Sequence, residues 1–273
     1  MGFLMLPILL TAALAPAVQA PAPTQAATAD PVSEAYFLFL QSRDLEQRGQ
    51  VESAIAALKK AIGVLPRAAE LHAELSGVYA REGRSAESVA AAKSALSIDP
   101  ANREANRWLG LVQAAVADLP ANAGLAGSLR TEAIGHLEKV LAAPVSDLQV
   151  QLTLGQLYAS SGQHDKAATT FKSFLQEQPG FPQALLGLGE SAERAGRWED
   201  AVAAWGQVMT LGGAAYKPRY ATALVNLGDQ YFAQKRYREA ADVFDRALTS
   251  DRTALDAADV TRKRDRAREL AGK

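Results

Sequence analysis

Three histidines are the residues best suited to ligate a metal in this 273-residue chain, which contains no cysteine. His72 and His136 fall in helical stretches and His164 falls at a turn, far apart along the chain. A metal site needs ligands that converge with a fixed geometry. None of the three has a second histidine one helical turn away. We therefore expect packing or solvent roles for all three, and no metal.

A glycine-rich stretch, residues 187–192, has the form G-x-G-x-x-A of a dinucleotide-binding fingerprint. That fingerprint works only after a strand and within a parallel sheet, where the helix that follows binds the pyrophosphate. Here the same residues lie inside a helical pattern, so the match is interpreted as accidental. No phosphate-binding loop, nucleophile elbow or H-E-x-x-H pattern occurs either. The sequence predicts no cofactor, no small-molecule substrate and no enzymatic activity.

Basic side chains gather near the carboxyl end, at Arg262, Lys263, Arg264, Arg266 and Arg268. Such a cluster can contact an anionic lipid surface or an acidic partner. Acidic residues interleave with it, at Asp256, Asp259, Asp265 and Glu269. We favour a solvated capping helix and keep peripheral membrane contact as the alternative. The net charge of −1 gives no reason to expect nucleic acid as a partner.

A 34-residue unit, AELHAELSGVYAREGRSAESVAAAKSALSIDPAN at residues 69–102, reads as two short helices with a turn between them. Large apolar residues at helical spacing form a buried stripe. Small residues such as Ser76 and Ser88 let the paired helices approach closely. Gly83 ends the first helix because glycine adopts the left-handed conformation cheaply. Pro100 follows the second helix because proline cannot continue it.

The same register recurs along the chain, for example at Leu154-Gly155 with Tyr158, and at Leu227-Gly228 with Tyr231. One hairpin cannot bury its own apolar face, so such units must stack. Six copies are predicted, at about residues 35–68, 69–102, 103–147, 148–181, 182–215 and 221–251. Residues 252–273 are expected to form a capping helix with Leu255, Val260, Ala267 and Leu270 on its inner side.

These repeats resemble the tetratricopeptide repeat family over roughly residues 35–251. The resemblance implies an all-α fold, a right-handed superhelical solenoid of about six helix-turn-helix repeats, in place of other helical-hairpin arrays with different periods. It also implies a concave groove, lined by the first helices, that binds a peptide or another protein. The corresponding groove positions here are Phe39, Arg43, Glu74, Arg107, Trp108, Thr153, Gln156, Glu190, Asn226, Asp229 and Phe232.

The family's clamp for a carboxyl terminus needs lysine and asparagine at matched groove positions. This chain has Arg43, Glu74 and Gly77 there, which argues against that type of receptor.

Three segments depart from the repeat. The first helix carries a run of large apolar residues at 36–40, which either pack on the preceding linker or form a contact surface. An insertion at 118–131 is expected to be a turn lying back on the solenoid edge, or else a partner-contact loop. Gly212-Gly213 and Pro218 indicate a looser joint between the last two repeats.

The amino-terminal residues 3–15 form a short apolar run interrupted by Pro7, and small residues follow it. We interpret residues 1–29 as a signal peptide cleaved after Ala29, with cleavage after Ala20 as an alternative, and residues 30–34 as a linker. No lysine or arginine precedes Arg43, so an uncleaved membrane anchor is the competing interpretation. The absence of cysteine excludes lipid attachment at a cysteine.

Together these features predict a non-catalytic scaffold or adaptor for proteins or peptides in the bacterial cell envelope, exported and periplasmic. The alternative is a membrane-tethered or self-associating assembly factor of the envelope.

Overall fold

The computed structural model describes residues 30–142 and 145–272, and this part of the chain is all-α, as predicted. Its helices pair into six antiparallel hairpins followed by a single helix. The hairpins are α1 (Pro31–Gln47) with α2 (Val51–Val64), α3 (Ala69–Arg81) with α4 (Ser85–Ile98), α5 (Arg103–Ala117) with α6 (Ala126–Leu141), α7 (Leu148–Ser160) with α8 (His164–Glu177), α9 (Pro182–Arg194) with α10 (Trp198–Thr210), and α11 (Lys217–Ala233) with α12 (Tyr237–Ser250). The last helix is α13 (Ala257–Ala271).

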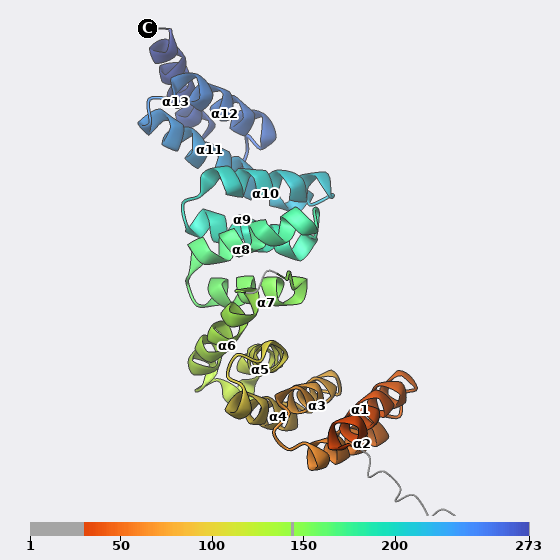
Figure 1. Ribbon diagram of the computed structural model, residues 1–273. Coiled ribbons are helices and arrows are strands. Elements are labelled where there is room, and N and C mark those ends of the chain that lie inside the picture. Colours follow the sequence, from red (N-terminus) through yellow and green to blue (C-terminus); the bar gives the residue numbers. More distant parts are fainter. Residues whose placement is uncertain (1–29, 143–144, 273) are drawn as a thin grey trace, which may run out of the picture.

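The hairpins stack into an elongated solenoid (Figure 1). Helices α7 to α13 form a column, and the first two hairpins, α1 to α4, lie at an angle to it. The array therefore bends around the third hairpin. Each second helix contacts the first helix of the following hairpin, which buries the apolar stripe that one hairpin leaves open. The buried apolar residues form several clusters along the array, and the largest of them runs from α5 to α12.

Five of the six hairpin turns in the described chain, all except the one between α5 and α6, contain one residue in the left-handed conformation. Gly83 has φ of +70°, and its amide donates to Ala80 O at 3.1 Å while the amide of Arg84 donates to Tyr79 O at 2.9 Å. This pair of bonds satisfies carbonyls that the end of α3 would leave free. The last hairpin closes in the same way, but Lys235 occupies the turn with φ of 61°.

Close approach of the two helices within a hairpin depends on small residues, as the repeat pattern predicts. A Cβ placed at Gly155 would lie 2.8 Å from the Phe171 ring, and one at Gly189 would lie 2.6 Å from the Trp205 ring. In the second hairpin, two serines allow the same close approach of the helices. Ser76 Oγ and Ser88 Oγ lie 3.0 Å apart in a buried hydrogen bond. The rings of the second helices therefore occupy the space that a side chain on the first helix would fill.

Several predicted boundaries are wrong. Residues 30–34 are not a linker, because α1 begins at Pro31 and Asp30 caps it by accepting from the amide of Ser33. An aspartate followed by proline is a strong helix start. Of the predicted insertion, only residues 118–125 leave the α-helices, with a short 3-10 helix at Pro120–Asn122. The remainder, from Ala126, is the first part of α6.

The joint between the last two hairpins also differs from expectation. Helix α11 starts at Lys217 and includes Pro218 in its first turn, so the sixth repeat begins before residue 221. The preceding 3-10 helix, Ala214–Tyr216, places the Tyr216 ring on the Trp205 ring, with centroids 5.4 Å apart. This joint is packed rather than loose.

Helix α13 covers the open end of the last hairpin. Val260 and Ala267 are buried against α12, and Leu255 packs at the edge of the same cluster. The predicted leader, residues 1–29, lies outside the described residues. Among the helices of the described part, none is long and apolar enough to cross a membrane.

Candidate binding groove

Hollows follow the first helices along one face of the array. One of about 350 Å³ lies between α1, α3 and α5. Two larger ones, of about 570 and 490 Å³, lie between α5 and α7 and between α7 and α9. The two larger hollows share Gln156 and Ser160 and therefore adjoin each other; we call the two together the central trough. A further hollow of about 280 Å³ lies where α11 begins.

The hollow at the amino-terminal end is lined by charges that neutralise one another. Arg43 Nη1 lies 3.1 Å from Glu74 Oε1, and Arg81 Nε lies 2.7 Å from Glu46 Oε1. The guanidinium of Arg81 also lies over the Trp108 ring, 5.4 Å from its centroid. The predicted groove residues Arg43, Glu74 and Trp108 thus come together here, but Arg43 and Glu74 already pair with each other.

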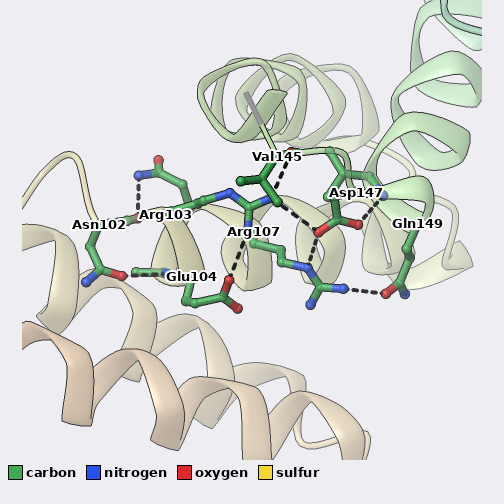
Figure 2. A network of polar contacts seen from close by, with 10 residues as sticks. Asn102, Arg103, Glu104, Arg107, Val145, Asp147 and Gln149 are labelled. Atoms are coloured by element: carbon green, nitrogen blue, oxygen red, sulfur yellow. Dashed lines mark hydrogen bonds and ion pairs between the residues drawn. The ribbon is translucent and has the colours of Figure 1, made fainter. Parts of the chain in front are cut away.

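Arg107 belongs to a joint between repeats rather than to an open surface (Figure 2). Its Nε donates to Asp147 Oδ2 at 2.6 Å and its Nη2 donates to Gln149 Oε1 at 2.7 Å. Asp147 in turn caps α7 by accepting from the amide of Val150 at 3.1 Å, and Arg103 lies 3.8 Å from the same carboxylate. Partial burial opposes ionisation of Asp147, but the hydrogen bonds from Arg107 and Val150 outweigh it and lower its pKa.

The central trough differs in character from this charged end. Many of its lining side chains are neutral polar or small, namely Gln149, Thr153, Gln156, Ser160, Gln183, Ala114, Ala115, Ala159 and Gly187. The charged residues in its lining are Asp118, Glu190 and Arg194. Two of its buried polar atoms, His164 Nδ1 and Ser191 Oγ, have no hydrogen-bond partner in the described chain. Buried polar groups are normally paired, so these atoms mark a surface with unused hydrogen-bonding capacity.

The remaining predicted groove residues spread over different environments. Glu190 lines the trough and pairs with Arg219 at 2.8 Å. Asn226 lines the hollow beside α11. Asp229 pairs with Lys263 of α13 at 2.8 Å, and the Phe232 ring contacts the Tyr237 ring with centroids 5.3 Å apart. The capping helix therefore engages the carboxyl-terminal end of the predicted groove.

Phe39 does not face the concave side. It lines an apolar hollow of about 260 Å³ at the amino-terminal end of the array, with Leu65 and Leu71. Beside it, four side chains of α1 are largely exposed, namely Val32, Tyr36, Phe37 and Leu40. No hairpin precedes α1 in the described chain to cover this surface.

The histidines and the glycine-rich stretch singled out in the sequence make contacts within the fold. His72 Nε2 lies 3.0 Å from Pro66 O, and His136 Nδ1 lies 2.8 Å from Asn106 Oδ1. Burial lowers the pKa of His136. Across residues 30–142 and 145–272, no cluster of histidine, aspartate or glutamate has the arrangement of a metal site. The G-x-G-x-x-A stretch lies within α9, where Gly187 and Gly189 contact the rings of second helices.

The basic residues of α13 are engaged with acidic neighbours. Lys263 bonds Asp229, Arg264 bonds Asp245 at 3.3 Å, and Arg268 also reaches Asp245. Arg262 and Arg266 pair one turn along their own helix, with Asp259 and Glu269. This pairing agrees with a capping helix.

Sequence reasoning missed Arg81, Ser191 and the Arg219 contacts. Arg219 donates to Glu193 Oε2 at 3.0 Å as well as to Glu190, and its guanidinium lies over the Trp205 ring. The signal that could have found these pairs is a separation of about one repeat between opposite charges, as between Arg81 and Glu46 or Arg219 and Glu190.

Comparisons with known proteins agree with this architecture. Sequence profiles described as "Tetratricopeptide repeat" match residues 39–103 and 152–213, and a second such profile matches residues 221–254. The peroxisomal targeting signal receptor of Kluyveromyces lactis is 24% identical over 230 residues, which are 75% of this chain and 40% of the receptor. The chain thus spans less than half the length of that relative.

Solved structures show the same fold. The crystal structure of MamA protein matches with a TM-score of 0.54 and 22% identity, over 69% of this chain and 96% of that chain. A second crystal structure of MamA matches with a TM-score of 0.51 and 23% identity, over 62% of this chain and 92% of that chain.

Proposed function

Because the chain belongs to the tetratricopeptide repeat family, we propose that it is a non-catalytic scaffold that binds a protein or an extended peptide in its central trough. The observation that carries this proposal is the extent of the two adjoining hollows from α5 to α9 together with their unpaired polar groups. An extended segment presents free backbone donors and acceptors, which glutamine, serine and threonine side chains can bond in either sense.

The structure redirects the choice of test residues. Arg107 and Trp108 are natural targets on sequence grounds, but Arg107 holds two repeats together, so changing it would perturb the fold. Gln156 and Thr153 line the trough, and neither side chain makes a hydrogen bond or ion pair with another described residue. We therefore expect Thr153→Arg combined with Gln156→Arg to block the trough while leaving the hairpins intact.

The test compares capture of partners from the native host by the wild type and by this double variant. A matched control places two arginines on the second helices, at the exposed positions Ala203 and Ser173. The proposal predicts partners that bind the wild type and the control but not the trough variant. Partners that bind all three equally would contradict it.

We further propose that the scaffold acts in the bacterial cell envelope after export. The apolar run at residues 3–15 and the small-residue stretches that follow it support this, since they have the order of a signal peptide. Fractionation of tagged protein tests the location, and mass spectrometry of the amino terminus tests processing. A start at Asp30 or Pro21 is expected for a released protein, an intact Met1 for an anchored one, and wholly cytoplasmic protein would contradict export.

A second candidate function, an assembly factor that pairs with another copy of itself, rests on the exposed face of α1. Val32, Tyr36 and Leu40 recur every four residues and are 59%, 61% and 47% exposed. The opposite end of the array carries the charged helix α13, so two α1 faces match each other better than either matches that end. Sedimentation of the wild type and of Tyr36→Glu with Leu40→Glu tests this, because only the wild type should dimerise.

A further inference from the structure

Arg194, the last residue of α9, is an exposed arginine in the lining of the central trough. Glu190 lies one helical turn before it and would be its ordinary partner. That carboxylate is instead bound by Arg219, at 2.8 Å. No ion pair or hydrogen bond of the Arg194 side chain occurs within the part of the chain that the structure describes. The other arginines that line the hollows, Arg43, Arg81 and Arg219, are all paired.

Ser191 lies one turn before Arg194 on α9 and lines the same hollow. It is 1% exposed, yet its hydroxyl has no hydrogen-bond partner among the described residues. His164, at the start of α8, contributes a second unpartnered buried atom, Nδ1, to this lining. Ser160, at the end of α7, closes this corner of the hollow, although its hydroxyl already donates to Leu157 O at 3.1 Å. A free guanidinium, one unpartnered hydroxyl and an imidazole thus line one hollow of about 490 Å³.

We propose that this corner binds the carboxylate of an acidic side chain, aspartate or glutamate, on the peptide that occupies the trough. The assignment rests on the proposed function of the trough. A guanidinium donates two parallel hydrogen bonds to a carboxylate, and the Ser191 hydroxyl and the His164 imidazole donate to the remaining lone pairs. Glu190, the acidic residue in the same lining, is held in an ion pair by Arg219, which weakens its repulsion of the ligand.

Arg219 has a positioning role in this proposal. It lies outside the hollow that contains Arg194 and holds Glu190 away from that guanidinium through the ion pair at 2.8 Å. When Arg219 is replaced by glutamine, Glu190 becomes free to pair with Arg194. The binding corner would then lose its cation although none of its lining groups has changed. A purely local role of Arg219 in packing on Trp205 would not change which peptides are preferred.

The test uses pools of fluorescent nonapeptides made from alanine, serine and glutamine, with both termini blocked. One pool carries glutamate at the central position and a matched pool carries glutamine there. A third pool has central glutamine and a free carboxyl terminus. Affinities are measured by fluorescence anisotropy for the wild type, Arg194→Gln, Ser191→Ala and Arg219→Gln. The control, Arg238→Gln, removes an exposed charge on α12. Circular dichroism confirms that each variant is folded.

The wild type and Arg238→Gln should bind the glutamate pool about tenfold more tightly than the glutamine pool. Arg194→Gln and Arg219→Gln should abolish that preference, and Ser191→Ala should reduce it several-fold. Equal binding of both blocked pools by the wild type would overturn the carboxylate subsite and leave peptide binding by the trough standing. Preference for the free carboxyl terminus alone would overturn the assignment to a side chain. Failure of every pool to bind would overturn the proposed function, and the subsite with it.

Discussion

Arg107 on α5 and Asp147 at the start of α7 are joined by a hydrogen bond of 2.6 Å between Nε and Oδ2. The two residues are 16% and 12% exposed, so the pair is partly shielded from water. It connects the first helices of two successive repeats at the place where the array bends (Figure 1). Because Asp147 also caps α7, one carboxylate stabilises the start of α7 and holds α7 against α5.

Replacing Asp147 by alanine should lower the free energy of unfolding more than replacing it by asparagine. Asparagine is a good helix cap, so Asp147→Asn loses the ion pair alone, with an expected cost of about 1 kcal/mol in the free energy of unfolding. Asp147→Ala loses the cap as well, with an expected cost of about 2 kcal/mol. Urea unfolding measures both. A double variant of Asp147→Asn with Arg107→Gln should be less destabilised than the sum of the single changes; strict additivity would show that the pair contributes nothing.

The same carboxylate should make stability depend on acidity. The pKa of Asp147 is lowered in the folded protein, so its stabilisation is present above the pKa of the unfolded chain, about 3.9, and is lost as the pH falls through the lower folded value. The difference in unfolding free energy between the wild type and Asp147→Asn should therefore shrink between pH 7 and pH 3. A difference that stays constant over this range would contradict the assignment.

Glycine within a helix should be required only where a neighbouring side chain occupies its side-chain space. A Cβ at Gly189 would lie 2.6 Å from the Trp205 ring, so Gly189→Ala is expected to destabilise the protein by about 1–3 kcal/mol. Gly135 in α6 has no atom within 4 Å of such a Cβ. Gly135→Ala should stabilise by about 0.5–1 kcal/mol because alanine is the better helix former. Thermal unfolding of the two variants should give shifts of opposite sign.

The last hairpin turn contains an avoidable strain. Lys235 adopts φ of 61°, where the other hairpins that close in this way, such as that at Gly83, have glycine. A side chain in this conformation costs about 1 kcal/mol relative to glycine. Lys235→Gly should therefore raise the unfolding free energy by up to that amount, while Gly83→Lys should lower it. Loss of stability in Lys235→Gly would show that the lysine side chain makes a compensating contribution.

The repeat pattern predicted the features that depend on neighbours in sequence. Gly83 ends a helix because of its own backbone freedom, and the Gly155 and Phe171 pair lies within one hairpin, so both can be read locally. The sequence also contains the signal for the start of α1, because Asp30 is a good helix cap and Pro31 follows it. The prediction places the start of the first repeat at residue 35 because it assigns residues 30–34 to a linker after the apolar leader. The missed start of α6 follows from glycines in residues 124–127, which favour a loop locally although α6 packs against α5.

The groove was less predictable, because it depends on contacts between repeats. Arg107 was assigned to an open surface, but its partner Asp147 follows 40 residues later, across the bend. Asp229 is also predicted to lie on the open groove, but it forms an ion pair with Lys263 of α13. Whether a charged residue is free depends on how successive hairpins are rotated, which the repeat alone does not specify. The unpartnered hydroxyl of Ser191 is visible only once α9 is placed against its neighbours.

Site-specific photo-crosslinking tests the central claim most directly. A photoreactive amino acid is placed at Gln156, in the shared wall of the central trough, and at Ala203, an exposed position on α10. If a partner binds along the first helices, irradiation in the native host should give a discrete crosslinked product from position 156 and none from position 203. Products from position 203 alone, or equal products from both, would contradict binding in the trough.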